Sequence, residues 1–173
     1  CGQELLLPAL MLAQIALTLW LVETGFQFET PDRLQLQLAN TLHHLPTAAS
    51  ANSSSGLFTV VVGNPPFAGV SENREEWMRK LLRGTSPDSG TEVANYFQVE
   101  GMPLGERKHW LEDDYVKFFR FAHWQIERAD AGIIALVTNH GFLDNSTFRG
   151  MREQLLKTFG NIDIVDLHGN SRS

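Results

Sequence analysis

The stretch Phe58-Thr59-Val60-Val61-Val62-Gly63-Asn64-Pro65-Pro66-Phe67 decides the predicted fold. Its first half is a short run of β-branched residues without alternation, which is typical of a central parallel strand buried on both faces. Gly63 and the two prolines end that strand abruptly, because proline fixes φ and has no N–H group to donate. The stretch therefore predicts a buried strand that leaves the sheet through a rigid loop.

The flanking sequence alternates between helical and strand-like segments. Upstream, residues 6–23 predict an apolar helix that is covered on most sides and ends at Gly25, and residues 33–39 predict a strand with one buried face. Downstream, we expect helices over 72–84, 113–128 and 145–159, and strands over 132–138 and 162–167. This order predicts an α/β fold with an open parallel sheet. Its ligand would lie beyond the carboxyl ends of the strands, where Asn64 and Asn139 stand.

Length and composition indicate one domain over residues 1–173. The chain is 43% hydrophobic and 20% charged, which is ordinary for a soluble globular protein. Residues 45–56 are low in complexity and predict a flexible loop, while 85–110, rich in glycine and proline, is expected to be irregular. A single cysteine, Cys1, excludes an internal disulfide and favours the cytoplasm.

Residues 5–22 are mostly apolar and about long enough to cross a bilayer. Pro8, Gln14 and Thr18 interrupt the segment, and no lysine or arginine lies near its ends to orient it in a membrane. We therefore expect a helix buried against a sheet and no membrane contact.

The loop Asn64-Pro65-Pro66-Phe67 carries the candidate chemistry. The Asn64 side-chain oxygen and the Pro65 carbonyl oxygen can accept both hydrogens of an exocyclic amine and draw its nitrogen toward tetrahedral geometry. Gly63 lets the backbone approach a ligand closely, and Phe67 can stack on a nucleic-acid base. The alternative is a rigid strand exit with Phe67 filling the core.

Several stretches of the chain resemble one known family. They are residues 23–26, 40–42, 63–67, 113–118, 137–145, 148–152 and 166–170. In this order they resemble the adenine-N6 DNA methyltransferase region of type ISP restriction–modification enzymes and of predicted helicase–methylase relatives. In those enzymes, Asn-Pro-Pro-Phe/Tyr follows a hydrophobic strand.

The resemblance implies a Rossmann-like fold that uses S-adenosylmethionine. The implied reaction transfers a methyl group from S-adenosylmethionine to the N6 amine of a flipped adenine in DNA. The residues with implied catalytic roles are Asn64, Pro65, Pro66 and Phe67, and those implied to bind the cofactor are Glu4, Asn40 and Asn64.

Glu4 and Asn40 each have an alternative role. Glu4 falls where the family places the acid that binds the cofactor's ribose hydroxyls, but it could equally be a solvated charge at a helix start. Asn40 replaces the acid that usually touches the cofactor's adenine, and a structural turn is its alternative role.

Other polar residues are expected to be structural. For Asn139, where relatives often have proline, a turn or helix cap is at least as well supported as a ligand contact. The pair Asp113 and Asp114 predicts a helix cap. The six histidines show no ligand spacing with cysteines or acids, so no metal site is expected.

Two parts of the family pattern are absent from the 173 residues. The first strand with its glycine-rich loop, which holds the methionine part of the cofactor, would precede residue 1, and the target-recognition domain would follow residue 173. We therefore expect a partial catalytic domain that is inactive in isolation. Its partners would be those missing domains and double-stranded DNA, bound mainly through regions outside the chain, since a net charge of −6 is unfavourable for binding phosphates.

Two other functions are compatible with the motif. The first is an amino-methyltransferase that acts on protein glutamine or on RNA; the long segment 68–112 favours DNA instead. The second is a non-catalytic α/β module that recognises DNA or a partner with a decayed site. The intact Asn64-Pro65-Pro66-Phe67 argues against such decay.

Overall fold

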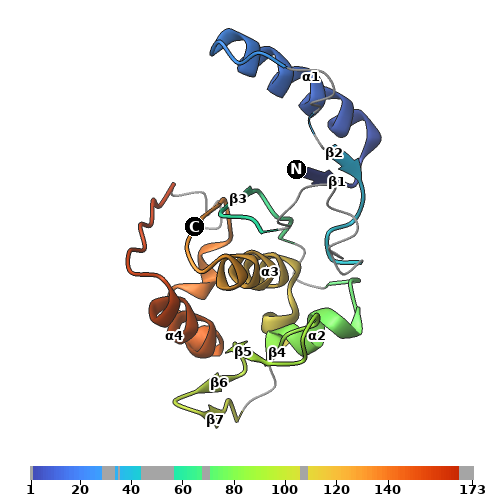
Figure 1. Cartoon of the computed structure of the whole chain (residues 1–173). Coiled ribbons are helices and arrows are strands. Elements are labelled where there is room, and N and C mark those ends of the chain that lie inside the picture. The colour runs from blue at the N-terminus through green and yellow to red at the C-terminus, as the bar shows by residue number, and fades with distance from the viewer. Residues whose placement is uncertain are drawn as a thin grey trace. The chain divides into compact units, whose positions relative to one another are not determined.

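The computed structural model describes residues 2–28, 34, 36–43, 57–67, 71–105 and 109–167. The chain divides into two compact units, Cys1–Thr47 and Ala48–Ser173, and each is described by itself (Figure 1). The expected flexible loop 45–56 lies outside the described residues.

The first unit contains two short parallel strands joined by a helix. Strand β1 (Gly2–Glu4) pairs with β2 (Leu36–Leu38), and helix α1 (Leu7–Glu23) lies between them in the sequence. The predicted helix and its end are confirmed. Gly25 has a φ of +87°, and the backbone N–H of Phe26 donates to the Leu21 carbonyl at 2.9 Å, as in glycine-terminated helices.

The surroundings of α1 differ from the prediction. None of its residues is buried, and Leu12 and Trp20 are 68% and 60% exposed. The prediction of a helix buried against a sheet is therefore wrong for this chain. A helix that is apolar on all sides is normally covered by other parts of a protein. The exposure of α1 means that no described element covers it. Among the described residues, no helix combines the length and apolarity needed to span a bilayer.

The second unit is built on a parallel pair, β3 (Val60–Gly63) and β8 (Ile133–Leu136). Val61 and Ile134 are partly buried on one face, whereas Val62 and Ile133 on the other are 74% and 63% exposed. The prediction of strands buried on both faces is therefore wrong. Only one face of the pair is covered in the described part of the chain, by helix α3.

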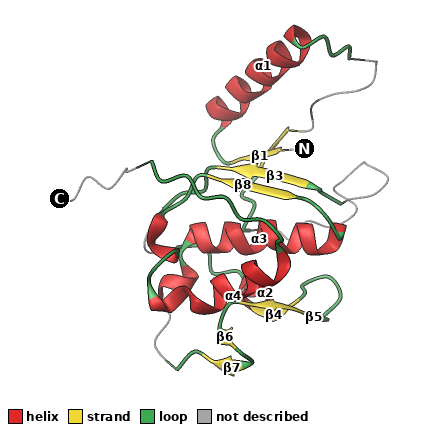
Figure 2. Ribbon diagram, turned by 90° about the vertical axis from the view of Figure 1, so that its left-hand side faces the viewer, coloured by secondary structure: helices red, strands yellow, loops and turns green. Residues whose placement is uncertain are grey.

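Helix α3 (Asp114–Ala129) is the centre of the second unit and confirms the predicted helix. Figure 2 shows α3 between the β3–β8 pair on one side and α2 with its neighbouring hairpin on the other. Because α3 is covered on both sides, even polar residues such as Arg120 and His123 have no exposed surface. The apolar core around it includes Met78, Leu81, Leu82, Tyr96, Leu111, Tyr115, Val116, Trp124, Phe148 and Met151.

Between β3 and α3 lie α2 (Glu76–Leu82) and two hairpins. The first hairpin pairs β4 (Arg83–Thr85) with β5 (Glu92–Asn95), and the second pairs β6 (Gln98–Val99) with β7 (Met102–Pro103). The segment 85–110, expected to be irregular, thus contains regular structure. Its turns use glycine, with a φ of +70° at Gly90 and +76° at Gly101.

After β8 come the 3-10 helices η3 (His140–Phe142) and η4 (Ser146–Phe148), and then α4 (Arg149–Thr158). The Asn145 side chain accepts from the Thr147 N–H at 2.9 Å, which confirms the predicted helix start. Residues 162–167 do not form the predicted strand. Their apolar side chains, including Val165 at 80% and Leu167 at 77% exposure, have no strand beside them in the described part of the chain.

The mixed α/β character predicted from the sequence is confirmed. Both strand pairs that are joined through a helix are parallel, as expected. They form separate two-stranded sheets, so a continuous Rossmann-like sheet stays a prediction.

Candidate active site

The loop Asn64-Pro65-Pro66-Phe67 leaves β3 at its carboxyl end. The carbonyl oxygen of Gly63, the last residue of β3, accepts a hydrogen bond from the Val137 N–H at 3.0 Å. Because β3 and β8 are parallel, Asn64 and Asn139 follow the same edge of the pair. The prediction that both residues lie beyond the carboxyl ends of strands is confirmed.

The loop presents an amide and an aromatic ring outward. Asn64 is exposed and Phe67 is 52% exposed, whereas Pro65 is buried. Two prolines restrict the backbone of the loop, and the burial of Pro65 fixes it further. Phe67 does not fill the core, and both it and Asn64 are accessible to a ligand.

Asn139 has a structural role. Its Oδ1 accepts a hydrogen bond from the Gly141 N–H at 2.7 Å and caps η3. The predicted capping function is therefore confirmed.

In the first unit, Glu4 and Asn40 lie at one edge of the β1–β2 pair. Glu4 is the last residue of β1, and its carbonyl oxygen accepts from the Ala39 N–H at 2.9 Å, directly after β2. The Glu4 Oε1 atom accepts from the N–H groups of Leu5 and Leu6 at 2.8 and 3.0 Å. Because these bonds use Oε1, the other carboxylate oxygen, Oε2, is the atom that could accept from a ligand hydroxyl.

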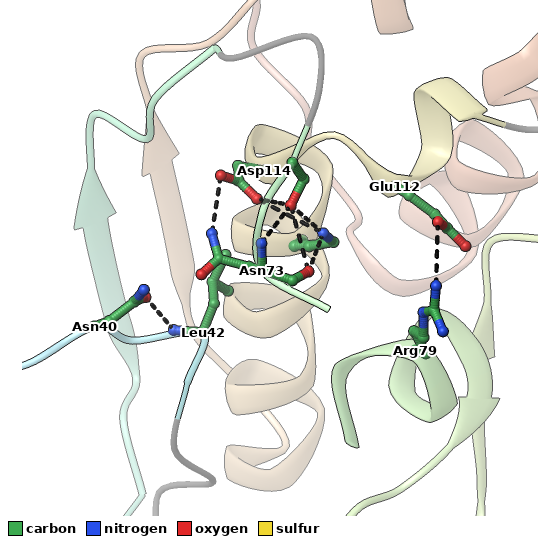
Figure 3. A network of polar contacts seen from close by, with 8 residues as sticks. Asn40, Leu42, Asn73, Arg79, Glu112 and Asp114 are labelled. Atoms are coloured by element: carbon green, nitrogen blue, oxygen red, sulfur yellow. Dashed lines mark hydrogen bonds and ion pairs between the residues drawn. The ribbon is translucent and has the colours of Figure 1, made fainter. Parts of the chain in front are cut away.

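Asn40 forms a turn. Its Oδ1 accepts from the Leu42 N–H at 3.0 Å (Figure 3), an arrangement by which asparagine stabilises local turns. The structural turn role is therefore present. An amide oxygen has two lone pairs, so Asn40 Oδ1 could still accept from an amino group of a ligand.

A second group of polar residues lies at the start of α3. The Asp114 carboxylate accepts from Asn73 Nδ2 at 2.9 Å (Figure 3), and Lys117 Nζ lies 3.6 Å from Asp114 Oδ1. Asp113 occupies the N-cap position but makes no side-chain capping hydrogen bond. The predicted cap position at this acid pair is therefore confirmed, but without a capping hydrogen bond from the Asp113 side chain. The Asp114 carboxylate binds Asn73 instead.

A concavity of the second unit lies elsewhere. It has a volume of about 400 Å³ and is lined by residues that include Glu127, Asp130, Gly132 and Thr158. Gly132 precedes β8, whereas Asn64 and Asn139 follow the strands, so this concavity is at the opposite end of the pair. Among the described residues, no three His, Cys, Asp or Glu side chains are arranged to hold a metal ion.

Most of the chain matches a known protein family. The model of the Eco57I restriction-modification methylase family matches residues 13–172. The chain belongs to this family. The Eco57I family match includes Asn40, the Asn64–Phe67 loop and α3, whereas Glu4 precedes it. It confirms the expected restriction–modification methylase region. No curated protein and no solved structure matches the chain.

Proposed function

We propose that the chain supplies the catalytic loop of an adenine-N6 DNA methyltransferase that uses S-adenosylmethionine. The observation that carries this proposal is the Asn64-Pro65-Pro66-Phe67 loop at the carboxyl end of a parallel strand, with Asn64 and Phe67 exposed. Membership in a restriction-modification methylase family supports it. The matching stretches favour the type ISP and helicase–methylase branch.

The loop suits an amine that is a poor nucleophile. The lone pair of the adenine N6 atom is delocalised into the ring, so the nitrogen must be drawn toward tetrahedral geometry before it attacks. Asn64 Oδ1 and the Pro65 carbonyl oxygen would each accept one amine hydrogen. The rate would then come from alignment and fixed dipoles, without a strongly shifted pKa.

Phe67 would hold the base in the site. Removing a base from the duplex costs a few kcal/mol, and stacking on an aromatic side chain returns about 1–3 kcal/mol. The 52% exposure of Phe67 leaves its ring available for this contact.

The residues at the edge of β1 and β2 fit a nucleoside. Glu4 Oε2 would accept a hydrogen bond from a ribose hydroxyl, and Asn40 Oδ1 would accept one from the adenine amino group. S-adenosylmethionine, when bound, supplies the electrophilic methyl group. Asn64 would contact both the cofactor and the base.

Substitution of Asn64 tests the proposal. In the intact protein, Asn64→Ala should lower adenine methylation at least about 100-fold, as the loss of one placed hydrogen-bonding group typically does. Asn161→Ala, at an exposed position, is the matched control. Mass spectrometry of nucleosides from methylated plasmid DNA gives the product. Undiminished N6-methyladenine in the Asn64 variant, or methyl transfer only to protein or RNA, would refute the proposal.

We further propose that the 173 residues are inactive alone and that DNA is bound mainly by other regions of the protein, in the cytoplasm. The net charge of −6 and the two separate strand pairs support this. Measurable cofactor binding and adenine methylation by the isolated chain would contradict it.

A further inference from the structure

A buried polar cluster joins the segment after the catalytic loop to the first turn of α3. Its members are Ser71, Asn73, Asp114 and Lys117, and we call these four residues the Ser71–Asn73 clamp. The Asp114 carboxylate accepts hydrogen bonds from Ser71 Oγ and from Asn73 Nδ2, the latter at 2.9 Å. The Lys117 ammonium donates to Ser71 Oγ and to the Asn73 carbonyl oxygen, the latter at 2.6 Å.

The hydrogen-bonding capacity of Ser71 is filled inside the clamp. A hydroxyl donates one hydrogen and can accept two. Ser71 Oγ donates to Asp114 and accepts from Lys117 and from the Asn73 N–H, the last at 3.1 Å. The segment Ser71–Asn73 is therefore held from both sides, through its side chains and through its backbone.

The two charges of the clamp are withdrawn from water. The side chains of Asp114 and Lys117 are 9% and 4% exposed. Burial lowers the pKa of Lys117, and the nearby carboxylates of Asp114 and Glu112 oppose that shift. A buried ion pair adds little net stability over apolar residues of the same volume. A gain in stability thus does not by itself explain why Asp114 and Lys117 are both buried and both hydrogen-bonded to the short segment Ser71–Asn73.

The contact between Ser71 and Lys117 does not make a nucleophile. A serine nucleophile needs a neighbouring base that takes its hydrogen. Lys117 donates a hydrogen to Ser71 Oγ and takes none from it, so Lys117 is not such a base. Lys117 acts as a donor, so the cluster is suited to holding a segment in place.

The clamp lies at the far end of the catalytic loop. On the near side, β3 pairs with β8 through Gly63, whose carbonyl oxygen accepts from the Val137 N–H. On the far side, Ser71 follows Phe67 by four positions, which limits their separation to about 14 Å even in an extended chain. One end of the loop thus leaves the strand pair directly, and the other end is followed within four residues by a segment that is bound to α3.

We propose that Asp114 and Lys117 are positioning residues that fix the far end of the Asn64–Phe67 loop and thereby align the target base. This inference rests on the proposed function. A misplacement of about 1 Å can cost about 100-fold in rate, so loosening one end of the loop should lower kcat even though neither charge touches the substrate.

The test uses a double variant of the intact protein, Asp114→Asn with Lys117→Met. Removing both charges leaves neither of them buried and unpaired, which avoids the large destabilisation of a single substitution. The control, Glu153→Gln with Lys157→Met, removes an ion pair on α4 whose lysine is 61% exposed. Both variants are compared for kcat and KM with plasmid DNA, for S-adenosylmethionine Kd, for the thermal unfolding midpoint and for amide hydrogen exchange over residues 64–73.

In the clamp variant, kcat should fall at least about tenfold, and amide exchange over residues 64–73 should become faster. The cofactor Kd should match that of the control, and the variant should remain folded at the assay temperature. A kcat within twofold of the control, or a loss of kcat matched by equal losses of cofactor binding and thermal stability, would overturn the inference. An unsubstituted protein without adenine methylation would refute the proposed function instead. The exchange rates would then still show whether the clamp holds the loop.

Discussion

His123 is fully buried on α3 and uses both ring nitrogens. Nδ1 lies 3.0 Å from the Tyr96 hydroxyl, and Nε2 lies 2.8 Å from Thr158 Oγ1. Burial, and then the charge of Arg120, lower the pKa of His123 to about 3. The nearest acid, Glu127, is 3.9 Å from Nε2 but pairs with Arg120 at 2.9 Å. The folded protein therefore keeps this imidazole neutral.

Lowering the pH should destabilise the second unit through His123. The unfolded chain takes up the proton near pH 6.5 and the folded chain only near pH 3. The stabilising contribution is thus complete above about pH 6.5 and is lost as the pH falls toward 3. At about pH 4.5, two units below the unfolded value, the loss is about 3 kcal/mol.

Urea unfolding at pH 7 and at pH 4.5 measures this loss. His123→Gln keeps a neutral polar group. The unfolding free energy of this variant should therefore depend on pH less than that of the unsubstituted protein, by about 3 kcal/mol over this interval. The control is His140→Gln, at an exposed position, which should leave the pH dependence unchanged. Equal pH dependence in the His123 variant and the unsubstituted protein would refute the reasoning.

Three further substitutions test other parts of the structure. Gly150→Ala places a Cβ 2.4 Å from the Tyr96 carbonyl oxygen and should cost about 1–3 kcal/mol in urea unfolding, whereas Gly160→Ala, with open space around it, should cost far less. Val62→Thr, at a side chain that is 74% exposed, should change the unfolding free energy by at most about 0.5 kcal/mol. Leu81→Ala, at a fully buried side chain, should lower it by about 2–5 kcal/mol. Equal losses of unfolding free energy in the two variants would contradict the exposure of this face of the sheet. Phe67→Ala in the intact protein should lower kcat/KM for DNA by about 5- to 150-fold, as lost base stacking would, with an unchanged unfolding midpoint.

Local sequence was sufficient to predict several elements. The β-branched run 58–62 predicts β3, because this pattern reports on the element that contains it. The acid pair Asp113 and Asp114 predicts the start of α3, because acids are favoured at helix N-termini. The exit of β3 into Asn64 and two prolines was equally predictable, since proline ends a strand by its own covalent structure. The burial of these elements was not predictable, because burial depends on which layer covers them.

The turns of the two hairpins could have been predicted from the sequence, although the overall composition of residues 85–110 indicates irregular structure. Pro87-Asp88-Ser89-Gly90 has the residues of a tight turn, and Glu100-Gly101 supplies two adjacent positive φ values, +51° and +76°. The glycine and proline content of residues 85–110 predicts irregular structure, although the same residue types also close hairpins. The clamp gave no such signal, because Ser71 and Lys117 lie 46 positions apart.

The buried polar residues of α3 explain why this segment is ordered. They recur at helical spacing along one side of α3, and their partners in the preceding segment follow in the same order along the chain. Lys117 binds Asn73, Arg120 binds the Leu81 carbonyl at 3.2 Å, Trp124 binds Ser86 Oγ at 3.2 Å, and Glu127 binds the Ala94 N–H at 3.1 Å. An unsatisfied buried polar group costs about 1–3 kcal/mol. If residues 71–96 took a different conformation, several of these polar groups would lose their hydrogen-bond partners. Residues 71–96 can therefore cover α3 only in conformations that run along its polar side. The proposed positioning of the Asn64–Phe67 loop and the order of the long segment after it therefore share one physical origin, the polar side chains of α3.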